Sequence, residues 1–428
     1  MKKLIFLLAT LITTVAFSQN QLSLSEAIEL GLKNNYDIKI IKLSQQIADE
    51  NNSWGTVGRF PSIDIGVGYR NRFDHTEAND IKSQTLAPYA QLNWVLFNGF
   101  AIFQNKYRLE DFYKLSEGNT ALVIENTIQA IILSYYNVLL EDEKLKVFEQ
   151  VNKLSKDRYD RELLSKEIGG SVTFQVLQAK NSWLEDKANF LSQKLSVENS
   201  VRRLNLLMGE KKDVKYVFSE NFDVEFIEYE FEDLKQKMLA NNKTLKNQYI
   251  NAIIKDREIA IARSSMFPKL ILNSGYDQST RKQTIDDFPS STSDAYDYYA
   301  NLSISLNIFN GFNTKRAIEI AKIQHEISKI QVEEMEHKLS NTLIQQLELY
   351  NIRKEILSVT EENVEAAKLN FEIAEEKYKS GAINSFNYRD IQIVYLNAST
   401  RRLNAVYSLK ETNTELARLT GSIITEKQ

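Results

Sequence analysis

The chain of 428 residues has no cysteine and only four prolines. Without cysteine it can form no disulfide framework, no thiol-based catalytic site and no lipid attachment through a thiol. The prolines are Pro61, Pro88, Pro268 and Pro289, so the long stretches between and after them contain no residue that forces a helix to break. Because 26% of the residues are charged, the composition is typical of long helices with solvated faces.

Histidine is also scarce, and the sequence contains no catalytic motif. The three histidines are His75, His325 and His337, and the last two lie twelve residues apart on one predicted helix, too far to share a metal ion. We find no phosphate-binding loop and no G-x-S-x-G motif. The formal net charge of −4 argues against binding to nucleic acid. We therefore expect no enzyme, no metal or other cofactor, and no nucleic-acid partner.

Long apolar runs are missing as well, with one short exception at the N-terminus. No stretch approaches the roughly 20 apolar residues of a membrane-spanning helix. Lys2 and Lys3 precede an apolar run that ends at Phe17, and residues 16–18 have the small-x-small pattern of a cleavage site. This pattern predicts a signal peptide over residues 1–18 and export of the mature chain.

The two halves of the chain repeat one another. Residues 32–69 align with 239–276 at a shift of 207, which places the Phe-Pro pair at 60–61 on the pair at 267–268. From Phe97 onward the shift is 212, which places Phe-Asn-Gly-Phe at 97–100 on the same four residues at 309–312. The five extra residues fall between two predicted strands, where a loop can absorb them. The predicted organisation is repeat one at 19–209, a linker at 210–231, repeat two at 232–421 and a tail at 422–428.

Each repeat is predicted to contain a first helix, two strands, a long helix, a glycine turn and a return helix. The predicted helices are 25–58, 101–168 and 171–208 in repeat one, and 232–265, 313–380 and 383–420 in repeat two. A helix of 68 residues spans roughly 100 Å, and Gly118 is a candidate local break. In the second long helix Leu357, Val364, Phe371 and Tyr378 recur every seven residues. Such a seam needs another helix to cover it, and the return helix can do so. An isolated coiled-coil stalk would show the same periodicity.

The predicted strands are 62–71, 86–97, 269–278 and 297–309, separated within each repeat by the polar segments 71–85 and 278–295. Apolar and polar residues alternate in them, for example Leu302, Ile304 and Leu306. About ten residues suffice to cross a membrane in a tilted strand. Four strands cannot close a barrel, and an open edge in lipid would leave backbone groups unpaired. Membrane strands therefore require two copies, giving eight strands, or three, giving twelve. A soluble sheet packed on the helices would show the same alternation.

Together these features resemble the TolC-like outer-membrane efflux proteins over almost the whole mature chain. The resemblance rests on LSLSEAIELGLKNN at 22–35, on the turns GGSVTFQVLQAK at 169–180 and YKSGAINSFNYRDIQ at 378–392, and on the strand–helix junctions. The junction residues are Pro61, Gly99, Pro268 and Gly311.

This resemblance implies a mainly α homotrimer with a small transmembrane β part. Four strands per chain would form a twelve-stranded outer-membrane β-barrel that contacts outer-membrane lipid and is continued by a long periplasmic α-helical barrel. The implied function is a passive export duct of a tripartite efflux or type I secretion system. Its implied partners are a periplasmic adaptor (membrane fusion) protein and an inner-membrane transporter. The alternative function is a periplasmic coiled-coil scaffold without a pore.

The resemblance also assigns residues to the periplasmic tip, where the family places its glycine turns. The adaptor-contact candidates are Gly169, Gly170, Ser171, Thr173, Gly381 and Ser385. A turn between antiparallel helices could equally be a plain connector.

Gate candidates follow from the same two turns. Asp390 falls on a ring aspartate of the family and Tyr378 on its network tyrosine, whereas Asn387 and Gln175 replace acidic residues. Ile383 replaces an arginine, so the salt-bridged lock of the family is not expected in its usual form. Three Asp390 carboxylates near one axis would repel one another and favour a bound cation. A solvated surface position would suit the same residue.

Overall fold

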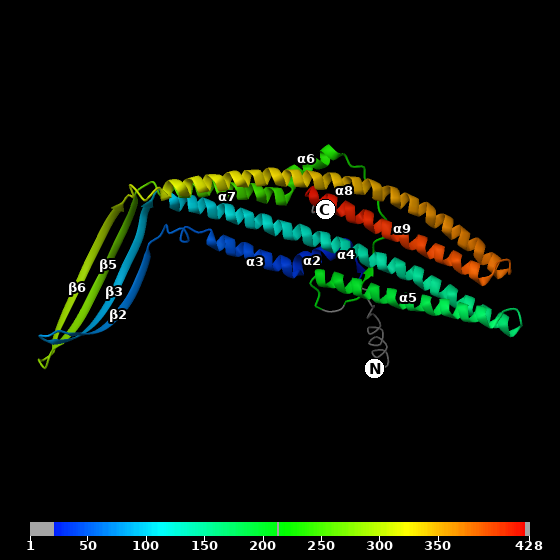
Figure 1. The fold of residues 1–428 in the computed structure, drawn as a ribbon, viewed down its shortest axis with the longest axis horizontal. Helices are drawn as coiled ribbons and strands as arrows, with labels where there is room; N and C mark the ends of the chain where they lie inside the picture. Colours follow the sequence, from blue (N-terminus) through cyan, green and yellow to red (C-terminus); the bar gives the residue numbers. More distant parts are fainter. Residues whose placement is uncertain (1–20, 212–213, 424–428) are drawn as a thin grey trace, which may run out of the picture. The chain divides into compact units, whose positions relative to one another are not determined.

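The computed structural model describes residues 21–211 and 214–423. The expected signal peptide at 1–18 lies outside the described residues, as do the last five residues of the expected tail. Most of the chain is helical and a small part forms a sheet (Figure 1), which confirms the predicted fold class. No helix in the described ranges has the length and apolar character needed to span a membrane.

The elements follow the same order in both repeats. Repeat one contains α2 (Leu24–Asn34), α3 (Tyr36–Asn51), β2 (Ser62–His75), β3 (Asp80–Asn98), α4 (Ala101–Glu167) and α5 (Thr173–Leu207). Repeat two contains α6 (Phe231–Asn241), α7 (Lys243–Ser264), β5 (Lys269–Ile285), β6 (Ser291–Ser305), α8 (Asn313–Lys379) and α9 (Ser385–Leu419). A short parallel pairing joins β1 (Gln21–Leu22) to β4 (Val217–Phe218) in the linker.

The prediction of one continuous first helix in each repeat is wrong. The helix of repeat one ends at Asn34 and a new one begins at Tyr36, because the Asn35 side chain accepts the backbone N–H groups of Asp37 (2.9 Å) and Ile38 (3.2 Å). An asparagine that caps the next helix in this way competes with continuation of the first. The second repeat breaks at the equivalent residue, Asn242.

Each of these asparagines also holds the end of the return helix of its own repeat. The Asn35 side-chain amide donates to the Leu207 carbonyl at 2.9 Å, and the Asn242 amide donates to the Leu419 carbonyl at 3.0 Å. Both carbonyls belong to last turns, where backbone acceptors lack a partner inside the helix. The start and the end of each repeat are therefore tied together.

The four long strands form one antiparallel sheet in the order β2-β3-β5-β6 (Figure 1). They extend further than the apolar alternation predicts, so the prediction that 71–85 and 278–295 are polar loops is wrong for most of both segments. The antiparallel ladder depends on backbone groups and continues where both faces are polar. Cross-strand bonds such as Thr280 to Asp294 (2.7 Å) and Arg281 to Ser83 (3.1 Å) support it there.

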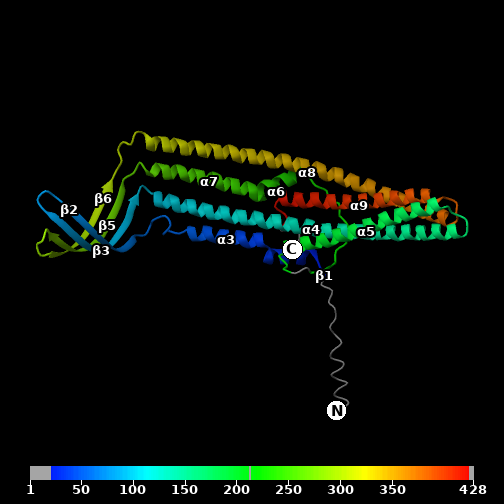
Figure 2. The ribbon, with the colours of Figure 1, turned by 60° about the horizontal axis from the view of Figure 1, so that its bottom comes forward.

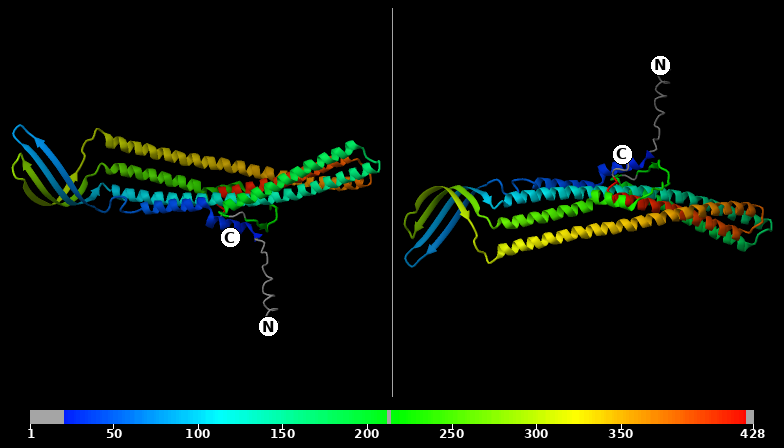
Figure 3. Two further views of the ribbon diagram at one scale, coloured as in Figure 1. Left: turned by 90° about the horizontal axis from the view of Figure 1, so that it is seen from below. Right: turned by 90° about the horizontal axis from the view of Figure 1, so that it is seen from above.

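The chain divides into two compact units, and these are not the two repeats. The first combines Met1–Lys42, Thr120–Lys243 and Glu336–Gln428, and the second combines Leu43–Asn119 and Thr244–Met335. Each unit therefore takes elements from both repeats. In the second unit, the helices lie side by side in the order α3, α4, α7, α8 next to the sheet (Figure 2). In the first unit, the hairpins α4–α5 and α8–α9 lie against each other (Figure 3).

The first unit has the main hydrophobic core, which includes two fully buried tyrosines. The Tyr135 hydroxyl donates to the Leu22 carbonyl at 2.9 Å, and the Tyr350 hydroxyl donates to the Ile227 carbonyl at 2.8 Å. A buried hydroxyl needs such a partner, since an unpaired one would cost free energy. These two bonds fix strand β1 onto α4 and the linker segment around Ile227 onto α8.

Gly118 does not interrupt α4, contrary to the sequence expectation. A Cβ at this position would collide with the side chain of Asn247 on α7. The glycine thus permits close approach of two helices.

Candidate functional site at the helix turns

The turns that follow α4 and α8 have the same backbone geometry. Gly169 and Gly381 have φ angles of +80° and +78°, in the left-handed region that glycine adopts without strain. The Gly170 N–H donates to the Ser165 carbonyl at 2.8 Å, and the Ala382 N–H donates to the Lys377 carbonyl at 2.8 Å. This pattern is the Schellman ending of a helix, so both turns are tight and locally specified.

The two return helices begin with different caps. In the first turn, the Gln175 side-chain oxygen accepts the Val172 N–H at 3.1 Å and the Ser171 hydroxyl at 2.8 Å. In the second turn, the Asn384 side chain accepts the N–H of Asn387 at 2.8 Å. Two of the predicted gate residues, Gln175 and Asn387, thus take part in capping helices, the second through its backbone.

Tyr378 is joined to the first turn by a short chain of hydrogen bonds. Its hydroxyl donates to Glu162 of α4 at 3.1 Å, and the Ser171 hydroxyl lies 2.7 Å from the other oxygen of that carboxylate. Through Ser171 the chain reaches Gln175. Burial, followed by the charge of Glu162, raises the pKa of Tyr378 to about 12, so the phenol stays protonated and can donate.

Stacked aromatic rings hold α8 against α9 beside this chain. The Tyr378 and Tyr388 rings are parallel within 8°, with centroids 4.7 Å apart, and Phe371 stacks on Tyr388 at 5.9 Å. Ile383 packs against the same group. The position where the family has an arginine therefore contributes apolar contact.

A buried ion pair lies further from the turns. Arg389 of α9 donates two hydrogen bonds to Asp186 of α5, at 2.6 Å and 2.8 Å, and the side chains are 13% and 3% exposed. The hydroxyl of Ser155 on α4 donates to the same carboxylate. A bidentate arginine–carboxylate pair is among the strongest and most directional charged contacts. It joins three helices.

Arg158 supplies a second buried cation beside this pair. It is 3% exposed, and its guanidinium donates to the Ser385 carbonyl at 3.3 Å, at the first residue of α9. Burial, followed by the like charge of Arg389, lowers its pKa. The positive charge near the turns thus comes from α4 and α9 and not from position 383.

The remaining predicted residues are solvent-facing. Asp390 and Asn387 are exposed on α9, Thr173 is exposed on α5, the three turn glycines are exposed, and Ser385 is half-buried. Among the predicted residues, Tyr378, Ser171 and Gln175 are brought into one connected group. Among the described residues, no cluster of three or more potential metal ligands is present.

Four residues of this region were missed by sequence reasoning: Arg158, Glu162, Asp186 and Arg389. One signal could have found two of them. In α5 the buried positions Val176 and Ala179 lead in 3-4 steps to Asp186, and in α4 Val151 leads in the same way to Arg158. A charged residue on an apolar seam needs a buried partner.

The strand–helix junctions of the second unit share an unusual turn. Gly99 and Gly311 have φ angles of +68° and +66°, and the following residues, Phe100 and Phe312, also have positive φ angles of 69° and 62°. Pro61 and Pro268, the other two predicted junction residues, directly precede β2 and β5. Positive φ is strained for a phenylalanine, and both repeats keep it.

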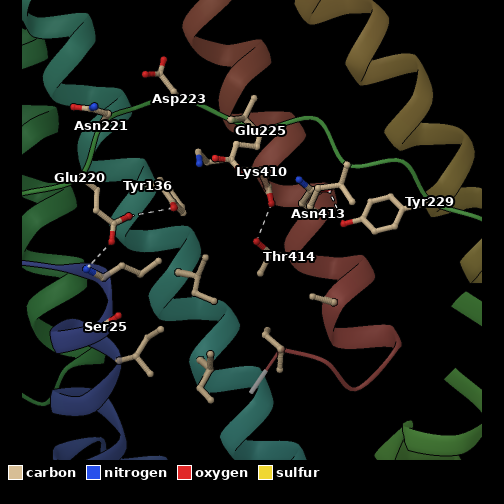
Figure 4. Close-up of a pocket in the computed structure, with 18 of the residues that line it drawn as sticks. Ser25, Tyr136, Glu220, Asn221, Asp223, Glu225, Tyr229, Lys410, Asn413 and Thr414 are labelled. Atoms are coloured by element: carbon tan, nitrogen blue, oxygen red, sulfur yellow. Dashed lines mark hydrogen bonds between the residues drawn. The ribbon is translucent and has the colours of Figure 1, made fainter. Parts of the chain in front are cut away.

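A cavity of about 950 Å³ opens in the first unit between α2, α4, α9 and the linker (Figure 4). The Lys410 ammonium lies 4.0 Å from the centre of the Tyr136 ring. Glu220 accepts hydrogen bonds from the Leu24 N–H at 3.1 Å and from the Tyr136 hydroxyl at 3.3 Å. Burial and the charge of Glu220 raise the pKa of Tyr136. The polar groups at the rim of the cavity thus largely interact with one another.

Several solved structures share this fold. CusC has a TM-score of 0.77 at 15% identity, with 93% of this chain and 92% of that chain covered. The Campylobacter jejuni CmeC outer membrane channel has 0.70 at 16% identity, covering 93% and 85%. The open-state MtrE outer membrane channel of Neisseria gonorrhoeae has 0.73 at 15% identity, covering 94% and 89%. At this identity the likeness shows the fold.

The sequence of residues 234–422 matches the family described as outer membrane efflux protein. This match covers most of repeat two. No curated protein sequence gives a significant match. The predicted recognition as a TolC-like efflux protein is confirmed.

The family match and the shared fold support an outer-membrane efflux channel with its helices in the periplasm. The family is one of channels and not of enzymes.

Proposed function

We propose that three copies form a passive duct: a twelve-stranded barrel in the outer membrane, continued by periplasmic helices that receive cargo from an adaptor and an inner-membrane transporter. Energy would come from the transporter, because the chain carries no nucleotide-binding motif. The cargo class is set by the pump.

The open sheet of the second unit carries this proposal. Its outer strands β2 and β6 have rows of exposed apolar side chains on one face, among them Ile65, Val67, Leu302 and Ile304. In the described part of the chain, each outer strand pairs on one side only. Lipid would cover the apolar face, but it cannot satisfy the free backbone groups of the edges. Closure with further copies satisfies both requirements.

The turns of the first unit are proposed as the adaptor contact. Each is followed by an exposed phenylalanine at equivalent positions, Phe174 (72%) and Phe386 (56%), and Ile168 and Val172 are exposed beside the first. Exposed apolar clusters of this kind are typical of protein contacts. Gly169, Gly170, Ser171, Thr173, Gly381 and Ser385 would supply backbone and polar contacts around them.

Asp390 is proposed as the charged group of the gate, with Tyr378, Gln175 and Asn387 supporting the turn geometry around it. Its exposed carboxylate leaves it available to the lumen. Three such groups around one axis would hold a multivalent cation more strongly than any one alone.

The first test is the mass of the detergent-extracted protein, measured by light scattering with the detergent contribution subtracted. Three protomers are expected. A monomer, or extraction by carbonate without detergent, would overturn the duct and favour the periplasmic scaffold. For the adaptor contact, the amount of protein captured by the adaptor is compared between wild type, Phe174→Ser and Phe386→Ser. An unchanged trimer mass of each variant is the control.

A further inference from the structure

The alignment of the two repeats also carries their strand registers. In the hairpin of repeat one, Ser62 pairs with Asn93. Applying the shifts of 207 and 212 to these two positions gives Lys269 and Ser305, which are paired in the hairpin of repeat two. A register from one repeat therefore transfers to the other without adjustment.

The sheet contains one junction between repeats, where β3 of repeat one pairs with β5 of repeat two. In this antiparallel pair Ala90 lies opposite Tyr276 and Leu92 lies opposite Ser274. β2 and β6, at the two sides of the sheet (Figure 1), are the repeat equivalents of β5 and β3. They would meet in the same way if one copy of the chain followed another.

We propose that β6 of one copy pairs with β2 of the next copy in the register of the β3–β5 junction. Ala90 shifted forward by 212 is Leu302, and Tyr276 shifted back by 207 is Tyr69. Leu302 of one copy thus lies opposite Tyr69 of its neighbour, and Ile304 lies opposite Val67. This inference rests on the proposed oligomeric duct and assigns its interface.

The faces of the two strands agree with this register. Leu302 and Tyr69 are 64% and 65% exposed, and both belong to the apolar rows of their strands, as do Ile304 and Val67. A slip of one residue would instead place Leu302 and Ile304 opposite the other set of β2 residues, Gly66, Gly68 and Arg70, and would lose the apolar contacts. The register was derived without using the exposure or type of these side chains, so the match of the apolar faces supports it independently.

The helices next to the strands extend the interface. Inside the chain α4 meets α7, where Gly118 faces Asn247 and Asn119 bonds to it at 2.9 Å. The repeat equivalents of Gly118 and Asn247 are Ile330 on α8 and Ile40 on α3, which are 63% and 62% exposed. A polar contact within the chain becomes an apolar contact between chains, which supplies a driving force for association.

The aromatic residues at the strand–helix junctions support the same pairing between copies. The Phe100 ring packs edge-on against Phe267, with centroids 6.2 Å apart. Their repeat equivalents, Phe312 and Phe60, are both exposed in a single chain. Phe312 of one copy would therefore pack on Phe60 of its neighbour. This contact would explain why the strained backbone conformation at Phe312 is kept.

Disulfide trapping tests the register directly, because the natural chain contains no cysteine. The variant Leu302→Cys with Tyr69→Cys should form covalent dimers and trimers on mild oxidation, since directly opposite Cβ atoms lie about 5 Å apart. A bond within one copy is excluded because three strand spacings, about 14 Å, separate β2 from β6. Ile330→Cys with Ile40→Cys tests the helices in the same way.

The controls shift one cysteine by two residues on the same face. Leu302→Cys with Val67→Cys or with Asn71→Cys should cross-link several-fold less, because diagonal Cβ atoms lie about 7 Å apart. Preferential cross-linking of either shifted pair would overturn the register. Light scattering on each variant separates the two proposals: a trimer with the wrong pair refutes only the register, whereas the absence of any oligomer refutes the duct as well.

Discussion

Asp186 and Asp390 lie on the two return helices, α5 and α9, and their surroundings are opposite. Asp186 is 3% exposed and receives two hydrogen bonds from Arg389 and one from Ser155. Asp390, the next residue after Arg389, is exposed. Neighbouring residues of α9 thus lie in different environments: Arg389 faces the helix core, and Asp390 faces solvent. We expect loss of Asp186 to affect folding and loss of Asp390 to affect the channel.

The largest expected effect is that of Asp186→Ala. It would leave the buried Arg389 cation without its carboxylate, and breaking a buried pair costs about 3–5 kcal/mol of unfolding free energy. Thermal unfolding of the first unit in detergent, followed by circular dichroism, should show it. The double variant Asp186→Leu with Arg389→Met should regain most of the lost stability. An equal loss of stability in Asp390→Ala would contradict the difference between the two aspartates.

Gly381→Ala should have the next largest effect. A Cβ at φ +78° is strained by about 1–2 kcal/mol, although the site itself has open space. The unfolding midpoint should fall, whereas Ala382→Gly, one residue further on, should change it less. An unchanged midpoint for Gly381→Ala would mean that the turn relaxes to another conformation.

Tyr378→Phe should cost about 1 kcal/mol, since it removes one hydrogen bond to Glu162. The pKa of Tyr378 is raised from 10.0 to about 12, so its stabilising contribution is complete below pH 10 and is lost as the pH rises through 12. The stability difference between wild type and variant should therefore shrink between pH 10 and pH 12. A constant difference over that range would show that the phenol does not titrate in this contact.

Asp390→Ala should have the smallest effect on stability, with an unfolding midpoint within error of the wild type. Its effect should appear in single-channel recordings, as weaker block by multivalent cations from the periplasmic side. Asp390→Glu keeps the charge and should preserve the block. Unchanged block in Asp390→Ala would exclude this carboxylate from the gate.

The sequence was sufficient for features that depend on period and on local backbone demands. Seven-residue spacing predicted the long helices, alternation predicted the four strands and where β2 and β5 begin, and Gly169 and Gly381 marked the turns. The extra strand length was not predictable from alternation, because ladder pairing continues where both faces are polar. The break at Asn35 was missed because asparagine in a helical window is only a weak signal until its partner, Leu207, is known.

The charged groups at the turns were harder to foresee for a different reason. The partners Asp186 and Arg389 are 203 residues apart, and Tyr378 and Glu162 are 216 apart. Only the packing of two hairpins brings such residues together. The family resemblance pointed to Tyr378 but placed its partner on the position held by Ile383, which instead packs against the aromatic rings between α8 and α9.

The paired asparagines at the helix breaks have a consequence for how the chain can be divided. Asn35 holds Leu207 and Asn242 holds Leu419, so each repeat returns to its own starting point. The linker between them packs on both repeats but takes no part in either closure. Cutting the chain there, and expressing the halves as separate polypeptides, should therefore give fragments that reassemble, so that the proposed channel of three chains would become one of six.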